Sequence, residues 1–213
     1  SSAFRPKVMA RSVETLLEPV ARELSDRFAD ADAVDLVEEF AHLYPFTVIC
    51  RMLGLPVDDE RKLLGWVRGM LSFPWDPEGA LAASRAFTAH LAPVVAERRA
   101  RPGEDILSEL VSAEIDGRRL DDEEIHSFVR LLFPAGSDTT YKALGSLLAR
   151  ILCDDSLRKL VLERPELRPD VVEESLRLLR SDLLNRGVAL GTELAPALPA
   201  VNGDRNQLQQ VLI

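Results

Sequence analysis

Apolar residues recur at helical spacing along most of this chain, and the runs are bounded by residues that start or stop helices. Gly54 with Pro56 ends one run, Pro102 with Gly103 ends another, and Asp121 caps the longest. The pattern predicts helices over 8–29, 35–53, 58–73, 77–101, 104–115, 121–152, 154–163 and 169–180. We therefore expect a mainly α protein in which other helices pack across the central helix at 121–152.

The central helical run contains residues that a stable helix would avoid. Pro134 costs about 3 kcal/mol inside a helix, and Gly136 adds roughly 1 kcal/mol relative to alanine. Several local rules broken together point to a functional or strained site. The sequence therefore predicts a helix disrupted at Gly136, with a small pocket beside its axis.

An acid and a hydroxyl follow this predicted disruption. Asp138 and Thr139 could hold water and pass protons to a ligand bound in the pocket. In the alternative interpretation, Ser137 and Thr139 bond backbone carbonyls while Asp138 faces solvent. Spacing alone leaves both interpretations open.

A second pair of interest lies further along the chain. Glu174 and Arg177 stand three residues apart in a predicted helix, so they share a face and can form an ion pair. An exposed pair of this kind contributes well under ~1 kcal/mol to stability. The spacing is thus compatible with a structural brace or with an ordinary surface pair.

Composition and charge narrow the functional classes. The 213 residues carry a net charge of -9, which argues against a nucleic-acid or anionic-membrane surface. No apolar run is long enough to cross a membrane, and no signal peptide is visible. Cys50 and Cys153 lack metal or redox spacing and fit reduced thiols of a cytoplasmic protein. His42, His90 and His126 stand singly, so we predict no metal site.

Several motifs together carry a resemblance to a known family. Residues 132–140, Leu-Phe-Pro-Ala-Gly-Ser-Asp-Thr-Thr, resemble the oxygen-activating helix of bacterial cytochrome P450 enzymes, and residues 174–177 are similar to that family's E-x-x-R helix. Further similarities lie at 4–6, 34–37, 53–56 and 121–125. The resemblance spans about residues 4–178 and implies haem-dependent monooxygenation of a small organic substrate, supported by an electron-transfer partner.

The resemblance also implies roles for individual residues. Ala135 and Gly136 would line the oxygen pocket, and Asp138 with Thr139 would form the proton-delivery pair. Glu174 and Arg177 would brace the haem-binding loop. The helices between residues 58 and 101 would form a roof over the substrate pocket.

The sequence departs from the family pattern at the iron ligand. The family's cysteine loop, F-x-x-G-x-x-x-C-x-G, does not occur in these 213 residues, and neither Cys50 nor Cys153 has the required flanking residues. The family's haem-propionate contacts, expected just upstream of Phe4, are missing too. Since the thiolate ligand sets the chemistry of this cofactor class, we expect this chain to bind haem weakly and to be inactive as a monooxygenase.

The last 33 residues differ from the rest of the chain in their pattern of apolar and polar positions. Residues 188–194 are predicted to form a strand, residues 188–201 a strand or hairpin, and Asp204 caps a helix. Segments 183–190, 198–201 and 203–212 resemble the start of a sensor histidine kinase ATP-binding domain, but the chain ends before that family's Mg-ATP asparagine. We therefore predict a partial cytochrome P450-like domain at 1–180 and a partial kinase-like segment at 181–213.

Two other interpretations remain open. The chain could be a non-catalytic helical interaction module, because apolar faces around Phe128 to Phe133 would lack cover and would favour self-association. It could also be a rearranged or chimeric product, because two family resemblances meet near residue 180. A remnant of a sensor histidine kinase ranks third, since it depends only on residues 181–213.

Overall fold

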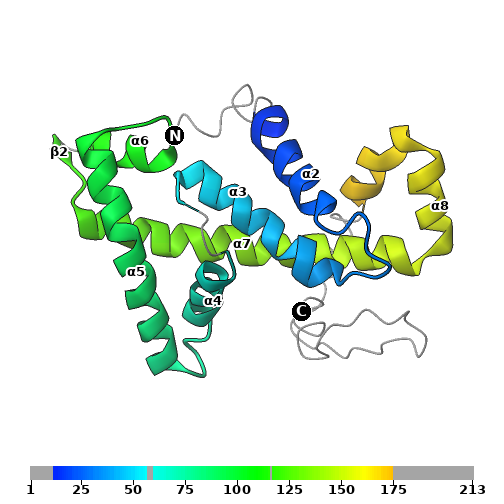
Figure 1. Ribbon diagram of the computed structural model, residues 1–213, viewed down its shortest axis with the longest axis horizontal. Helices are drawn as coiled ribbons and strands as arrows, with labels where there is room; N and C mark the ends of the chain where they lie inside the picture. The colour runs from blue at the N-terminus through cyan, green and yellow to red at the C-terminus, as the bar shows by residue number, and fades with distance from the viewer. Residues whose placement is uncertain (1–11, 57–59, 116, 175–213) are drawn as a thin grey trace. The chain divides into compact units, whose positions relative to one another are not determined.

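The computed structural model describes residues 12–56, 60–115 and 117–174 (Figure 1). Within these ranges the chain is mostly helical, as the hydrophobic pattern predicts. It divides into two compact units, which are described separately: one comprises Ser1–Ala29 with Leu43–Asp138, and the other Asp30–His42 with Thr139–Ile213. The boundary between the units falls inside one long helix.

The first helices of the larger unit are held together by packing and by charge. A π-helical turn, η2 (Val13–Leu17), leads into α2 (Glu18–Asp26), which buries Val20 and Leu24. Glu23 accepts a hydrogen bond from the Arg51 guanidinium of α3 (Leu43–Leu53). Arg27 bonds to Glu60 at 2.7 Å, which ties α2 to the start of α4 (Glu60–Leu71). These ion pairs join helices that the sequence predicted separately, at 8–29, 35–53 and 58–73.

Helix α3 ends at a glycine that the backbone geometry requires. Gly54 has a φ of +69°, a left-handed conformation that glycine adopts without strain. Its carbonyl accepts a hydrogen bond from Arg98 Nη2 at 3.0 Å, and Arg98 Nε bonds to Asp105 at 2.6 Å. Asp105 also caps α6 (Ile106–Ser112) by accepting from the Ser108 amide. The predicted stop at Gly54 is therefore confirmed and serves as a junction of three helices.

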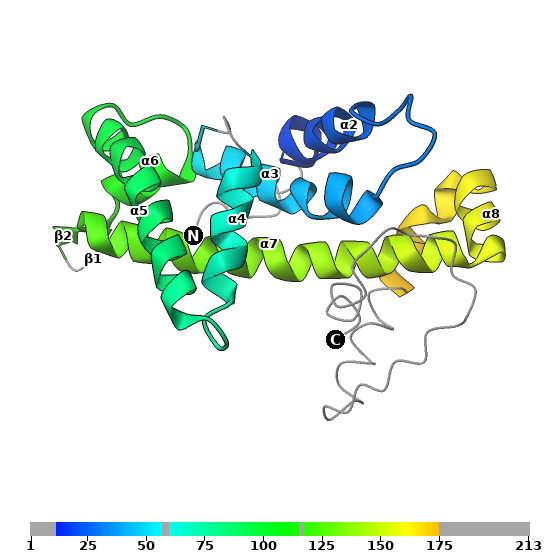
Figure 2. The same cartoon turned by 60° about the horizontal axis from the view of Figure 1, so that its bottom comes forward.

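Helices α4 and α5 form a hairpin of helices on the larger unit. Asp76 caps α5 (Pro77–Ala100) by accepting from the Gly79 amide at 3.0 Å. Figures 1 and 2 show α4 and α5 side by side, with α5 crossing the N-terminal part of α7 (Asp122–Cys153). The predicted helix at 77–101 is thus confirmed, and the helix predicted at 58–73 is present over Glu60–Leu71, while residues 58 and 59 lie outside the described residues.

A short hairpin occupies a segment that the sequence pattern assigned to a helix. The helix predicted over 104–115 ends at Ser112, and β1 (Glu114–Ile115) pairs antiparallel with β2 (Arg118–Arg119). Gly117 has a φ of +78° in the turn between them, which suits a tight hairpin. Among the described residues this is the only sheet.

Helix α7 begins with a capping box. The Glu124 amide donates to Asp121 Oδ1 at 2.8 Å, and the Asp121 amide donates to Glu124 Oε2 at 2.9 Å. From there α7 runs without interruption from Asp122 to Cys153, through both Pro134 and Gly136. The predicted start of the central helix is confirmed, whereas the predicted disruption at Gly136 is wrong.

The smaller unit contains the C-terminal part of α7 and the segment 30–42. A second π-helical turn, η3 (Val37–Ala41), places His42 where it is 4 % exposed. His42 Nδ1 lies 3.2 Å from Glu38 Oε1, and its ring centroid is 3.9 Å from that of Tyr141. Beyond α7 follow α8 (Asp155–Glu163), capped by Asp154, the 3₁₀ turn η4 (Pro165–Leu167), and helical residues 168–174.

Some predictions fall outside the described residues. These are the similarity at 4–6, Arg177, the strand at 188–194, the hairpin at 188–201, and the helix capped by Asp204. Among the residues that the structure describes, no helix is long and apolar enough to span a membrane.

Candidate functional site

The predicted site residues lie on α7, whose two faces differ sharply. Residues four apart, namely Ile125, Val129, Phe133 and Ser137, are buried. On another face, Leu131 is 73 % exposed, and Ala135 and Thr139 follow it at the same spacing and are also exposed. Because residues four apart share a helix face, α7 presents one packed face and one open face. Thr139 belongs to the open face.

Aromatic rings hold the packed face in place. Phe133 is fully buried between two other rings, with centroid distances of 5.4 Å to Phe46 of α3 and 5.5 Å to Phe87 of α5. Such tilted and edge-on pairs are the favoured arrangements for aromatic side chains. This cluster fixes the rotation of α7 in the larger unit and so determines which residues remain open.

Two residues of the Pro-Ala-Gly-Ser-Asp-Thr-Thr segment have structural roles on this packed side. Ser137 Oγ donates to the Phe133 carbonyl at 2.7 Å, which matches the backbone bond expected for Ser137 in the alternative interpretation. At Gly136 an added Cβ would lie 2.9 Å from Ile49 Cδ1. Gly136 therefore permits close packing of α7 against Ile49. The pocket predicted beside the helix axis, with Ala135 and Gly136 lining it, stays a prediction.

The remaining motif residues are placed by the helix but their chemical roles stay predictions. Asp138 is partly buried and precedes Thr139 directly, so the acid and the hydroxyl stand about 100° apart around α7. Proline at 134 has no amide to bond to the Arg130 carbonyl, one turn earlier.

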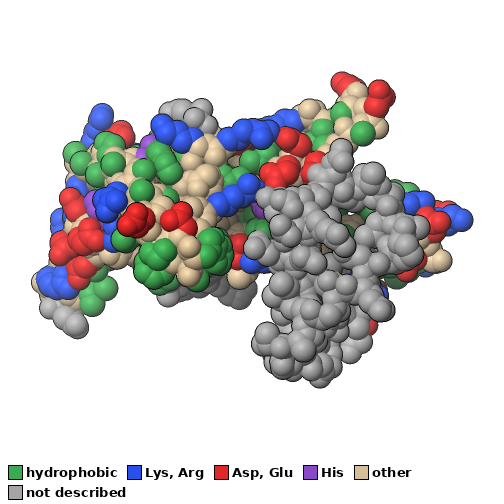
Figure 3. Space-filling view, turned by 90° about the horizontal axis from the view of Figure 1, so that it is seen from below, with side chains coloured by type: hydrophobic (Ala, Val, Ile, Leu, Met, Phe, Trp, Pro, Cys, Tyr) green, Lys and Arg blue, Asp and Glu red, His purple; other side chains and the backbone are tan. Residues whose placement is uncertain are grey.

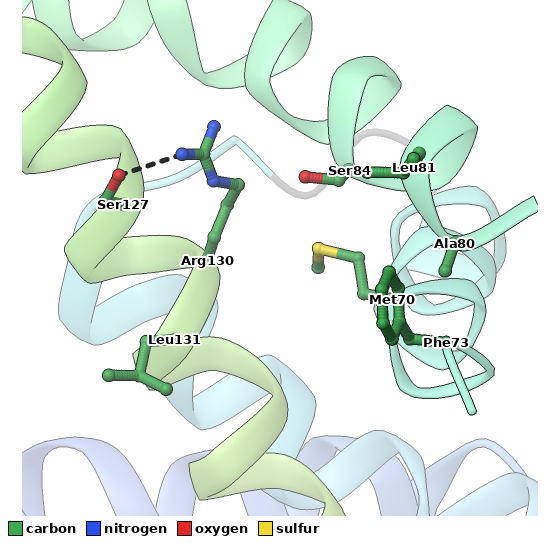
Figure 4. A pocket seen from close by; sticks show the side chains of 8 residues that line it. All are labelled: Met70, Phe73, Ala80, Leu81, Ser84, Ser127, Arg130 and Leu131. Atoms are coloured by element: carbon green, nitrogen blue, oxygen red, sulfur yellow. Dashed lines mark hydrogen bonds between the residues drawn. The ribbon is translucent and has the colours of Figure 1, made fainter. Parts of the chain in front are cut away.

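An open groove of about 380 Å³ lies beside the exposed face of α7, between it and the α4–α5 hairpin (Figure 4). It is lined by Met70, Phe73, Ala80, Leu81, Ser84, Ser127, Arg130 and Leu131. The groove lies within the larger unit. Its walls include the helices at 58–101 that the resemblance assigned to a pocket roof.

Arg130 is the charged group of this groove. Its Nη2 donates to Glu123 at 2.5 Å and to Ser127 at 2.8 Å, and its Nη1 donates to Thr88 at 2.9 Å. The hydrogen bond and charge of Arg130 lower the pKa of Glu123, which keeps that carboxylate ionised. Sequence reasoning missed Arg130, because one arginine within a helical pattern gives no sign that it borders a groove.

The two cysteines differ in their exposure. Cys50 is fully buried on α3, where loss of hydration, and secondarily the charge of Glu60, raise its pKa to about 12. It is therefore a neutral thiol at physiological pH, whereas iron in this cofactor class binds a thiolate. Cys153 is exposed at the last residue of α7. At Cys50 the structure therefore does not fit axial ligation of haem by cysteine.

The histidines have packing roles in the described residues. His42 pairs with Glu38, His126 Nδ1 lies 4.0 Å from Glu123 Oε2, and the His90 ring stacks at 5.7 Å from that of Trp66. No group of three potential metal ligands occurs among the described residues.

Half of the predicted brace can be located. Glu174 is exposed in the helical stretch 168–174, and Arg177 lies outside the described residues. The proposed pairing of the two therefore stays a prediction.

Comparisons with known proteins give a consistent answer. The chain is 38 % identical over 187 residues to the erythromycin C-12 hydroxylase of Saccharopolyspora erythraea, covering 83 % of this chain and 46 % of that protein. It is 35 % identical over 173 residues to cytochrome P450 107B1 of the same organism, covering 79 % of this chain and 42 % of that protein. No family model matches the chain.

Solved structures agree with these sequences. The LnmA cytochrome P450 hydroxylase of Streptomyces atroolivaceus superposes with a TM-score of 0.74 at 34 % identity, covering 83 % of this chain and 46 % of that structure. The cytochrome P450 PksS of Bacillus subtilis gives a TM-score of 0.73 at 30 % identity, with 83 % and 45 % covered.

Cytochrome P450 homologues thus cover about 83 % of this chain, and the chain has the helical fold of the corresponding part of those proteins. It spans less than half the length of the relatives it matches. The kinase resemblance at 181–213 has no support in these comparisons.

Proposed function

We propose that this chain is the part of a haem-dependent monooxygenase that carries the proton-delivering helix. The observation that carries the proposal is the open face of α7, where Thr139 is exposed beside Asp138 in a helix whose opposite face is locked by Phe133. A hydroxyl next to an ionisable acid can hold a water molecule and move a proton. The substrate would be a small organic molecule and the electrons would come from a partner protein.

We further propose that the chain by itself forms no haem–thiolate complex. Burial raises the pKa of the Cys50 thiol to about 12, so this thiol is neutral at physiological pH, and Cys153 is exposed at the end of α7. Without an axial ligand the chain has no bound iron, so Asp138 and Thr139 are idle in the isolated chain. We also propose that the cytochrome P450-like part of the chain ends at about residue 180.

The test compares the isolated chain with a graft. Residues 12–174 replace the aligned segment of the Bacillus subtilis PksS protein, and both proteins are loaded with haem, reduced and exposed to carbon monoxide. We expect the thiolate-type Soret band from the graft and not from the isolated chain. A thiolate band from the isolated chain would overturn the second proposal. The double variant Cys50→Ala, Cys153→Ala is the control that assigns any such band to these thiols.

The graft also tests the proton pair. Thr139→Ala should leave the absorption spectrum of the graft unchanged but divert consumed oxygen from product to peroxide, whereas Thr139→Ser should restore product formation. If both variants yield as much product per oxygen as the unmodified graft, Thr139 is not part of proton delivery.

A further inference from the structure

The groove beside α7 combines an apolar wall with a separate polar edge. Phe73, Leu81 and Leu131 border it and are 56 %, 50 % and 73 % exposed. Figure 3 shows hydrophobic side chains gathered on the face of the molecule where the α4–α5 turn lies. Exposed apolar surface that lines a concave site is typical of ligand binding. The wall is therefore suited to the hydrocarbon part of a small molecule.

The polar edge is formed by side chains from α5 and α7. In Figure 4 the Ser84 hydroxyl points across the groove toward the Arg130 guanidinium, and Met70 lies below the two. Among the described residues the Ser84 Oγ has no hydrogen-bond partner. A ligand in the groove would meet this hydroxyl and the guanidinium together.

The hydrogen bonds of Arg130 leave only part of its capacity for a ligand. A guanidinium has five N–H groups. Both on Nη2 are used by Glu123 and Ser127, and one on Nη1 is used by Thr88. The Nε–H and one Nη1–H thus have no partner among the described residues.

The occupied Nη2 determines what kind of oxygen can bind. A carboxylate binds arginine through two parallel N–H groups. A guanidinium has two edges that offer such a pair, Nε–H with Nη2–H and Nη1–H with Nη2–H, and both edges include an Nη2 hydrogen. Neither edge is open here, and the ionised Glu123 beside Arg130 would repel a second carboxylate. A single neutral acceptor, such as a carbonyl or ether oxygen, can still accept from Nε–H or from Ser84.

We propose that this groove binds an apolar small molecule carrying a neutral oxygen acceptor, with Arg130 and Ser84 as the residues that select it over a carboxylate. The proposal rests on the proposed function, because it names the class of organic substrate that such a monooxygenase would take. Arg130 is here a specificity residue and takes no part in proton delivery.

The test uses the full 213-residue chain and no haem. Methionine methyl groups are labelled with ¹³C, and since the chain has three methionines, Met70 is assigned by the loss of its signal in Met70→Leu. Three probes of matched skeleton are titrated: 1-adamantyl methyl ketone, 1-ethyladamantane and adamantane-1-carboxylate. The chemical shift of the Met70 methyl group gives the dissociation constant of each.

We expect the ketone to shift the Met70 signal and to bind about ten- to a hundredfold more tightly than the hydrocarbon or the carboxylate, the gain of one hydrogen bond to a charged donor. Arg130→Met keeps the side-chain stem and should reduce ketone affinity to within about threefold of that of the hydrocarbon. Ser84→Ala, at a partly exposed helical position, should weaken ketone binding about threefold and leave hydrocarbon binding unchanged.

Four results would overturn the proposal: no shift of Met70 with any probe, equal affinity for ketone and hydrocarbon, tighter binding of the carboxylate, or unchanged ketone affinity in both variants. Ser84→Ala keeps the test decisive if Arg130→Met does not fold. Because the titration needs no haem and the spectral test needs no organic probe, either proposal can fail while the other stands.

Discussion

Replacing Phe133 by alanine tests the rotation of α7, on which every conclusion about its open face depends. Phe133 is fully buried, and its ring contacts those of Phe46 and Phe87 at centroid distances of 5.4 and 5.5 Å. Leu131 lies two residues earlier on the same helix and is 73 % exposed. Both are apolar positions in one predicted helix, so only the structure predicts that their substitution has different effects on stability.

The expected cost follows from burial and ring geometry. Truncating a buried phenylalanine to alanine costs about 3–5 kcal/mol of unfolding free energy, because a cavity remains. Each lost aromatic pair accounts for about 0.5–1.5 kcal/mol of that. We therefore expect Phe133→Ala to lose about 4 kcal/mol, a large share of the roughly 5–15 kcal/mol that holds a typical protein folded. Phe133→Leu, which keeps most of the volume, should lose about 1–2 kcal/mol.

The assay is urea unfolding of the 213-residue chain, followed by far-ultraviolet circular dichroism. Leu131→Ala is the matched control on the exposed face and should change the unfolding free energy by no more than about 0.5 kcal/mol. A loss at Leu131 equal to that at Phe133 would refute the assigned rotation of α7. The groove and the exposed Thr139 would then lose their basis.

Two further predictions concern the thiols and the start of α7. Cys153 is exposed, and Cys50 is buried with its pKa raised to about 12. A thiol reagent at neutral pH should therefore modify one thiol per chain quickly, and none quickly in the variant Cys153→Ala. Rapid modification of two thiols would contradict the burial of Cys50. Glu124 accepts hydrogen bonds from Arg118 and from the Asp121 amide, which lower its pKa to about 2. Its stabilising contribution is therefore full above its unfolded pKa of about 4.3 and is lost as pH falls through its folded pKa of about 2. Urea titrations should show Glu124→Gln less stable than the parent at pH 7, with most of the difference gone near pH 2.

The beginnings of helices could be predicted because their signals are local. Asp76, Asp105 and Asp154 each accept a hydrogen bond from an amide two or three residues later, and these caps place the starts of α5, α6 and α8. Asp121 with Glu124 does the same for α7. Asp121, the cap named from the sequence for the central helix, is thus the acid that bonds to the start of α7 in the structure.

The groove could not be predicted because it depends on how helices pack. Its residues come from α4, the turn that follows it, α5 and α7, and no local pattern brings Ser84 and Arg130 to one edge. The hairpin at 114–119 was missed for a different reason. Ile115 continues the helical apolar pattern, but Gly117, at a φ of +78°, turns the backbone instead.

The disruption predicted at Gly136 fails in a way that sharpens the candidate site. Glycine there allows α7 to approach Ile49, and Ser137 bonds the Phe133 carbonyl, so packing accounts for both residues. Packing does not account for Ala135 and Thr139, which are exposed four residues apart on the face that begins with Leu131. Close packing against Ile49 therefore accounts for the low helical propensity at Gly136. A chemical role for Asp138 and Thr139 stays a prediction, which the exposure of Thr139 favours.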